Sequence, residues 1–159
     1  MDIEKLLRDL GILYQLLTHD PIMTMEEGMT IAEKLQVVPI KNLFLVDKQG
    51  QHYLLLIEGS KKFKAKTVTK QIGCSHLSFG SAEDMQKLLG VNPGAVSVLG
   101  LVNDQQNQVC LLIDQEILDM EYIGCHPCVN TASVKLKTND LLKVLLPNIG
   151  HGEFKIVEV

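Results

Sequence analysis

The sequence predicts an α/β (α+β) fold in which a mixed, twisted β-sheet, or a partly closed barrel, is surrounded by helices. Helix and strand patterns alternate from one end of the chain to the other. Several predicted strands are neighbours in sequence, which favours antiparallel pairs and disfavours a regular Rossmann order. No linker or internal repeat divides the 159 residues, so we expect a single domain over 1–159 with one core.

Helices are expected where apolar residues recur every three or four positions next to capping residues. Thr24 has Glu27 three positions later, which is the spacing of a capping box. Gly11 and Gly90 stand where two of the helices are expected to end. The expected helices are 2–11, 24–35, 64–72, 81–90, 121–124 and 139–146.

Strands are expected in the short apolar segments between these helices. The clearest signal is KNLFLVDKQGQHYLLLIEG, residues 41–59, where two apolar runs around a DKQGQ turn predict a β-hairpin. Residues 95–102 and 108–114 are expected to form a second strand pair around the polar turn NDQQN. The other expected strands are 13–19, 76–80, 131–136 and 154–159.

Several classes of protein are disfavoured by what the sequence lacks. No apolar run approaches the roughly 20 residues of a membrane span, and the charged start MDIEKLLRDLG is unlike a signal peptide. We therefore expect a cytoplasmic protein that makes no membrane contact and keeps its four cysteines as free thiols. No GxGxxG or P-loop motif occurs, so no nucleotide cofactor is expected.

The charge of the chain is unevenly distributed. The net charge is −4, yet residues 59–82 carry five lysines and no acidic residue, which leaves −9 on the remainder. Such a segment can be a solvated helix face, or it can contact the phosphates of a nucleic acid. The lysines concerned are Lys61, Lys62, Lys64, Lys66 and Lys70.

The segment GCHPCVNTASVKL, residues 124–136, suggests three different kinds of site. Cys125 and Cys128 have the spacing of a redox dithiol, but a strand and not a helix is expected after them, so the helix that would activate a thiol is missing. Zinc needs four ligands, and no second close pair of ligands occurs, so no metal is expected. His126 is then either a loop histidine with a satisfied ring or part of a ligand-binding loop.

Lys41 and Asn42 open the apolar strand of the expected hairpin. Side chains alternate along a strand, so these two point to opposite faces and one of them lies on an apolar face. A lysine whose stem packs on a sheet beside a cleft can anchor a phosphate or a developing negative charge. The alternative is a strand-end lysine that reaches into water.

Five segments in order resemble a known family. They are LTHDPIMTMEEG, KNLFLVD, LSFGSAEDMQKLLGVNPGAVSVLGLVND, VCLLID and HPCVNTASV. Together they resemble the free-standing aminoacyl-tRNA deacylases of the YbaK/ProX type, relatives of the editing domain inserted in bacterial prolyl-tRNA synthetases. The resemblance extends from about Leu16 to Gly150. It implies the fold of that editing domain and hydrolysis of the ester that joins a wrong amino acid to the 3′ end of a tRNA.

The resemblance also implies roles for particular residues. Lys41, with Asn42 next to it, matches the lysine that holds the terminal nucleotide, and HPxxNT is matched in full, so that Cys128 falls at a variable position. Val98 replaces the proline of a Gly-x-x-x-Pro loop, which affects the expected shape of the amino-acid pocket. The implied catalytic residues are Lys41, Gly94, Gly100 and His126. The implied substrate contacts are Thr18, His19, Thr24, Asn42, Val96, Ser97, Val98, Pro127, Asn130 and Thr131.

The expected function is therefore trans-editing of mischarged tRNA, most plainly alanyl-tRNA(Pro), with tRNA as partner and a synthetase as a further one. No GxSxG occurs, so we expect attack by water, with backbone N–H groups near Gly94 stabilising the oxyanion and His126 orienting groups or carrying a proton. The lysines of 59–82 would then follow the acceptor-stem phosphates. Two alternatives stay open: a tRNA-end-binding module without hydrolysis, and a CxxC dithiol oxidoreductase.

Overall fold

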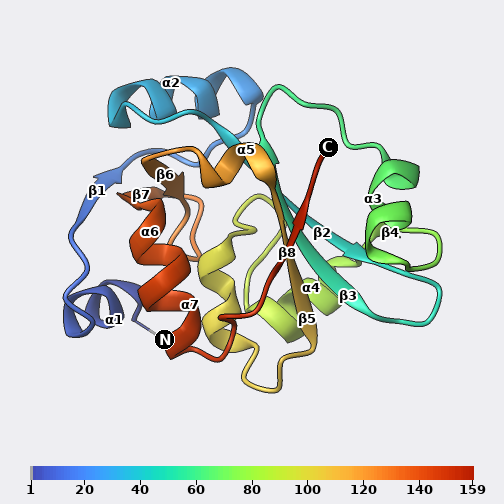
Figure 1. Cartoon of the computed structure of the whole chain (residues 1–159). Coiled ribbons are helices and arrows are strands. Elements are labelled where there is room, and N and C mark those ends of the chain that lie inside the picture. The colour runs from blue at the N-terminus through green and yellow to red at the C-terminus, as the bar shows by residue number, and fades with distance from the viewer. Residues whose placement is uncertain (1) are drawn as a thin grey trace.

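The computed structural model describes residues 2–159 and contains two β-sheets with helices packed around them (Figure 1). A three-stranded antiparallel sheet has the order β1-β7-β6, and a five-stranded mixed sheet has the order β4-β2-β3-β5-β8. The strands of the first are β1 (Tyr14–Thr18), β7 (Ala132–Lys137) and β6 (Tyr122–Cys125). Those of the second are β4 (Ser78–Phe79), β2 (Ile40–Val46), β3 (His52–Glu58), β5 (Val109–Asp114) and β8 (Lys155–Val157). The predicted mixed α/β fold is confirmed, whereas the sheets stay open and form no partly closed barrel.

The helices begin and end largely where the capping residues predict. Thr24 Oγ1 accepts the N–H of Glu27 at 3.1 Å, while the Glu27 carboxylate accepts the N–H of Met23 instead of that of Thr24. The larger helices are α1 (Ile3–Asp9), α2 (Met25–Leu35), α3 (Ala65–Ile72) and α4 (Ala82–Leu89). The shorter ones are the 3₁₀ helix η1 (Val98–Asn103), α5 (Gln115–Leu118), α6 (Thr138–Asp140), the π-helical η2 (Leu141–Leu145) and α7 (Leu146–Asn148).

The five-stranded sheet is built on the predicted hairpin. β2 and β3 pair antiparallel along their whole length, from Ile40 opposite Glu58 to Val46 opposite His52. β5 joins β3 in parallel and β8 joins β5 in parallel, which makes the sheet mixed. Because parallel neighbours need a crossover, the chain between β3 and β5 carries helices α3 and α4.

Two predicted elements are wrong. Residues 95–102 form no strand: Ser97 caps η1 by accepting the N–H of Leu99 at 3.1 Å, and the neighbours of β5 are β3 and β8 instead. A short buried apolar run fits a strand and a buried helix equally well, so its pattern could not decide. Residues 121–124 form no helix: β6 covers Tyr122–Cys125, where Ile123 and Cys125 alternate with more exposed residues, and the short helix α5 lies just before it.

Alternation along β2 and β3 divides the core into two clusters. Phe44 and Leu54 belong to the larger cluster, which fills the space between the two sheets and includes Val134 of β7. Leu45 and Leu55 point to the opposite face and pack with α3. Within residues 2–159, none of the helices has the combined length and apolar character that crossing a membrane requires.

Candidate active site

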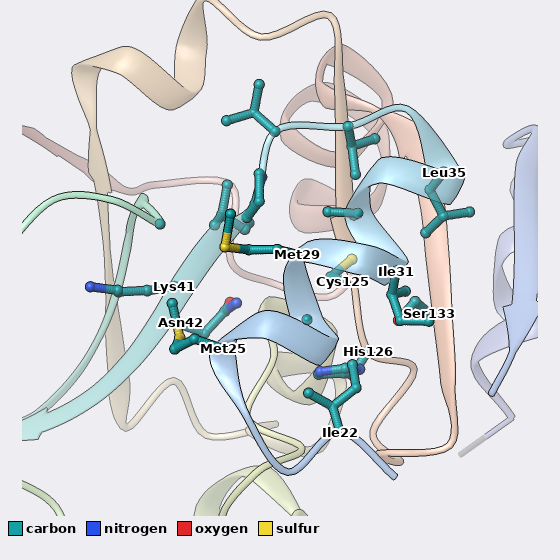
Figure 2. Close-up of a pocket in the computed structure, with 18 of the residues that line it drawn as sticks. Ile22, Met25, Met29, Ile31, Leu35, Lys41, Asn42, Cys125, His126 and Ser133 are labelled. Atoms are coloured by element: carbon teal, nitrogen blue, oxygen red, sulfur yellow. The ribbon is translucent and has the colours of Figure 1, made fainter. Parts of the chain in front are cut away.

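A cavity of about 210 Å³ lies between α2, the start of β2 and β6 (Figure 2). Its wall is mainly apolar. The apolar and glycine lining comes from Ile22, Met25, Gly28, Met29, Ile31, Ala32, Leu35, Val37, Val38, Pro39, Ile40, Gly59, Gly124 and Cys125. The polar lining is Thr24, Lys41, Asn42, His126 and Ser133. Four of the five polar lining residues are therefore among those that the sequence singled out.

His126 is held in one orientation by the backbone. Its Nδ1 lies 3.0 Å from the carbonyl oxygen of Ala132. A carbonyl only accepts, so Nδ1 carries the proton, and Nε2 of the neutral ring keeps its lone pair. Burial, with a smaller contribution from nearby His19, lowers the pKa of His126 below its ordinary value. At neutral pH this side chain is therefore a neutral imidazole that can accept a proton at Nε2.

His19 supports the same side of the cavity. Its Nδ1 donates to the carbonyl oxygen of Asp20 at 2.8 Å, and its Nε2 lies 2.9 Å from the hydroxyl of the buried lining residue Ser133. The ring centroid of His19 lies 6.4 Å from that of His126. The backbone N–H of His19 donates to the carbonyl oxygen of Thr131. His19 and Thr131 therefore join the ends of β1 and β7 behind the cavity.

Asn130 connects three segments near the cavity. Its Nδ2 donates to the carbonyl oxygen of the lining residue Ile22 at 2.9 Å. A Cβ added to Gly94 would lie 3.5 Å from that same Nδ2, so the loop at Gly94 is an immediate neighbour. Its Oδ1 is buried and accepts no hydrogen bond from the described residues. A buried acceptor without a donor is a group that a bound molecule can satisfy.

Lys41 and Asn42 point to opposite faces of β2, as the alternation predicts. The Asn42 Oδ1 accepts the N–H of Val98 at 3.1 Å, a bond that a proline at position 98 could not form. The stem of Lys41 lines the cavity, but its ammonium points away from His126 (Figure 2) and donates to the carbonyl oxygen of Lys61 at 2.8 Å. The two residues thus serve different parts of the site.

The loop that begins at Gly94 lies next to Asn130, and none of residues 94–100 lines the cavity. Gly94 is exposed and has φ +93°, a conformation that favours glycine. Ser97 and Val98 are buried, and Val96 packs against the larger core cluster. Gly100 is also buried, and a Cβ there would lie 3.2 Å from the Cβ of Leu89 on α4. Gly100 therefore allows η1 to pack closely on α4 and does not line the cavity.

The remaining predicted substrate contacts lie around this site without lining it. Thr18 pairs with Ala132 at the end of β1 and is exposed. Pro127 is half-buried directly after His126. The sequence analysis did not identify Ser133 or the residues of α2 that line the cavity. Met25 and Met29 lie one helical turn apart on α2 and both side chains are exposed, so a pair of methionines at this spacing is the feature that indicates an apolar wall.

The five lysines of the basic segment are not equivalent. Lys61 Nζ lies 2.7 Å from Asp114 Oδ2 and 2.9 Å from Glu116 Oε1, so its charge is neutralised by these two carboxylates. The other four side chains are exposed and form no ion pair with the described residues. They are Lys62, Lys64, Lys66 and Lys70.

The two cysteines of the segment 124–136, Cys125 and Cys128, lack the properties of a reactive pair. Both are free thiols, and burial raises the pKa of Cys125 to about 12 and that of Cys128 above its ordinary value. A dithiol exchanger needs the opposite shift, because the thiolate is the nucleophile. Within residues 2–159, no group of three or more potential ligands is placed to bind a metal ion.

Comparison with known proteins places this architecture in a family. The family model for the aminoacyl-tRNA editing domain matches residues 19–144. The prolyl-tRNA editing protein ProX of Acetoanaerobium sticklandii is 37% identical over 154 residues, which cover 96% of this chain and 93% of that protein. The prolyl-tRNA synthetase associated domain-containing protein 1 of Danio rerio is 28% identical over 146 residues, which cover 91% of this chain and 79% of the relative.

The fold comparison agrees with the sequence comparison. The solved structure of a candidate trans-editing enzyme for prolyl-tRNA synthetase superposes with a TM-score of 0.73 over 99% of this chain and 93% of its own, at 17% identity. That structural similarity shows a shared fold, while the family match and the 37% identity show which protein family the chain belongs to. The chain therefore belongs to the aminoacyl-tRNA editing domain family, a family of aminoacyl-tRNA deacylases.

Proposed function

We propose that this chain hydrolyses mischarged aminoacyl-tRNA in trans and that its substrate is alanyl-tRNA(Pro). The observation that carries the proposal is the neutral His126 in a small cavity of an editing-domain fold, held by its Nδ1 while its Nε2 forms no hydrogen bond with the described residues. The 37% identity to a prolyl-tRNA editing protein supports the choice of tRNA. The reaction belongs where aminoacyl-tRNA is made and used, in the cytoplasm, and a synthetase that releases the mischarged tRNA is a proposed partner.

The proposed mechanism uses His126 as general base. Nε2 takes a proton from a water molecule as the water oxygen bonds to the ester carbonyl carbon, which gives a tetrahedral oxyanion. Backbone N–H groups of the loop beginning at Gly94 and the amide of Asn130 are proposed to stabilise that oxyanion. The bond to the ribose oxygen then breaks, and the proton passes from Nε2 to that leaving oxygen. Free amino acid and deacylated tRNA result.

The anchoring of the tRNA end is assigned to the other side of the cavity. The only hydrogen bond of the Lys41 ammonium in the described structure is to a neutral carbonyl oxygen, so the ammonium can also face a phosphate of the terminal nucleotide. Lys62, Lys64, Lys66 and Lys70 are proposed to contact acceptor-stem phosphates. Gly59 lines the cavity, so the segment that carries these lysines leads directly away from it.

Discrimination against proline is assigned to the size of the cavity. About 210 Å³ is more than a proline side chain needs, since an apolar cavity of roughly 150 Å³ holds a benzene molecule, so the proposal requires the terminal nucleotide to fill part of the cavity and to leave room only for a small aliphatic side chain. Exclusion by overlap is necessary because attractive contacts distinguish one methylene group by only about 1–3 kcal/mol. Met25 and Met29 are the flexible part of this wall, since unbranched methionine side chains adapt to what they contact.

The test is a deacylation assay on tRNAs charged with alanine, cysteine, serine and proline, with the wild-type protein and His126→Asn in parallel. Asparagine can still donate to the Ala132 carbonyl from the position of Nδ1 but has no equivalent of Nε2. Release of alanine from tRNA(Pro) by the wild type alone supports the proposal. Binding of all four tRNAs without release of any amino acid would replace it with the tRNA-end-binding module.

A further inference from the structure

The loop between β3 and α3 begins against the wall of the cavity. Gly59 lines the cavity, and its N–H donates to the carbonyl oxygen of Pro39 at 2.7 Å. A Cβ at this position would lie 2.9 Å from that oxygen, so no larger residue fits without a backbone shift. The N–H of Lys61 then donates to the carbonyl oxygen of Glu58 at 3.1 Å, which closes a tight turn. The carbonyl group of Lys61 is therefore held close to the start of β2.

The side chain of Lys61 is engaged by the end of β5. Its Nζ lies 2.7 Å from Asp114 Oδ2 and 2.9 Å from Glu116 Oε1, and 20% of the side chain is exposed. The Asp114 side chain is 1% exposed, so its carboxylate is a buried charge that needs a partner. These two carboxylates raise the pKa of Lys61 above its ordinary value, through hydrogen bonds to Asp114 first and Glu116 second. Lys61 is thus committed to the protein and has no free charge for a phosphate.

The same residue holds the anchoring lysine through its backbone. The Lys41 ammonium donates to the carbonyl oxygen of Lys61 at 2.8 Å. Asp114, Lys61 and Lys41 therefore form a continuous chain of polar contacts from the buried end of β5 to the rim of the cavity. The side chain of Lys61 fixes the turn, and the carbonyl oxygen of the turn fixes the Lys41 ammonium.

We infer that Lys61 and Asp114 are positioning residues for Lys41, which they hold at the cavity rim ready for the terminal phosphate. The inference rests on the proposed function and corrects the assignment of Lys61 to the acceptor-stem phosphates. A lysine that is already ordered loses less rotamer freedom when the tRNA end binds. The pair acts on anchoring only, since His126 is held separately by Ala132 on the other sheet.

The test is a double-mutant cycle between the pair and Lys41. Lys61→Met leaves Asp114 as an unpaired buried charge, so it is combined with Asp114→Asn, which removes that charge at the same time. We expect this double variant to lower kcat/KM for alanyl-tRNA(Pro) by about tenfold, mainly through KM, while Lys61→Arg keeps the pair and most of the activity. In a Lys41→Ala background the same double variant should change kcat/KM by less than about twofold.

Controls separate positioning from loss of charge or of stability. Lys5→Met combined with Asp9→Asn removes an exposed ion pair on α1 with the same change in charge as the double variant and should leave kcat/KM unchanged. Asp114→Asn alone is the milder variant, because the amide oxygen can still face Lys61, and it must show the same dependence on Lys41. An equal loss with and without Lys41 would overturn the inference, and so would wild-type activity of the double variant.

A second readout keeps the inference separate from the proposed function. All variants are titrated with a tRNA that carries alanine through an amide bond at its 3′ end, which is not hydrolysed as the ester is. Loss of affinity that depends on Lys41 supports the positioning role even where the wild type releases no amino acid. Unchanged affinity in the double variant overturns the inference, while failure of ester hydrolysis alone overturns only the proposed function.

Discussion

The two sides of the cavity are built in different ways. On the three-stranded sheet, imidazole rings are held by backbone carbonyls: His126 by Ala132 and His19 by Asp20. On the five-stranded sheet, a charged group is held by a chain that ends at a buried carboxylate, Lys41 to Lys61 to Asp114. Neutral, fixed imidazole suits proton transfer, whereas a fixed cation suits anchoring of a phosphate. The comparison predicts that variants of the first side lower kcat and variants of the second raise KM.

The largest expected effect is on the first side. His126→Asn should lower kcat for alanyl-tRNA(Pro) by at least about 100-fold with little change in KM, because it removes the general base and leaves the anchor intact. Steady-state kinetics measure both constants, and His76→Asn, at an exposed histidine, is the matched control. An equal change in KM would show that His126 binds substrate instead of carrying a proton.

A smaller effect is expected on the second side. Lys41→Ala should lower kcat/KM by at least about tenfold, because a charge-assisted anchor contributes roughly 1.5–3 kcal/mol. Lys48→Ala, at an exposed lysine of the β2–β3 turn, controls for the lost charge. Thermal unfolding should hardly change in either variant. A large loss of stability in Lys41→Ala would make Lys41 a residue of the fold and not of the site.

The acid limb of the pH–rate profile tests the protonation state of His126 directly. The folded pKa of His126 is lowered in the free protein, so kcat/KM should fall only as the pH drops through a value below about 6.5, the ordinary pKa of histidine. The unfolded chain binds more protons between the folded pKa and about 6.5, so the contribution of this residue to stability is present above that window and is lost as the pH falls through it. Rates are measured between pH 5 and 8. A midpoint of the acid limb above 6.5 would contradict the buried environment that lowers the pKa of His126.

The smallest expected effect concerns the exposed lysines. Lys66→Ala should weaken tRNA binding by a few-fold and reduce the slope of log Kd against log salt by about one, as for one lost phosphate contact. Binding titrations at four salt concentrations measure the slope, with Lys87→Ala on α4 as the control. An unchanged slope would mean that α3 is a solvated face.

Sequence patterns between neighbouring residues predicted the helix caps and strand faces around the site better than they predicted its long-range contacts. The capping residue Thr24 and the alternation of Lys41 and Asn42 depend on neighbours in sequence, and the structure confirms both. The role of Lys61 could not be predicted in this way, because its partner Asp114 is 53 positions later in the chain. Residues 95–102 were misread because their apolar pattern suits a strand as well as the buried 3₁₀ helix that forms.

The thiol of Cys125 determines which chemical probes can work in this cavity. Cys125 lines the cavity, and burial raises the pKa of its thiol to about 12, so the thiol is protonated at neutral pH. Substrate mimics that carry a soft electrophile such as an acrylamide would therefore bind without forming a bond to it, since only the thiolate reacts. Covalent labels for this cavity need amine-directed groups aimed at Lys41.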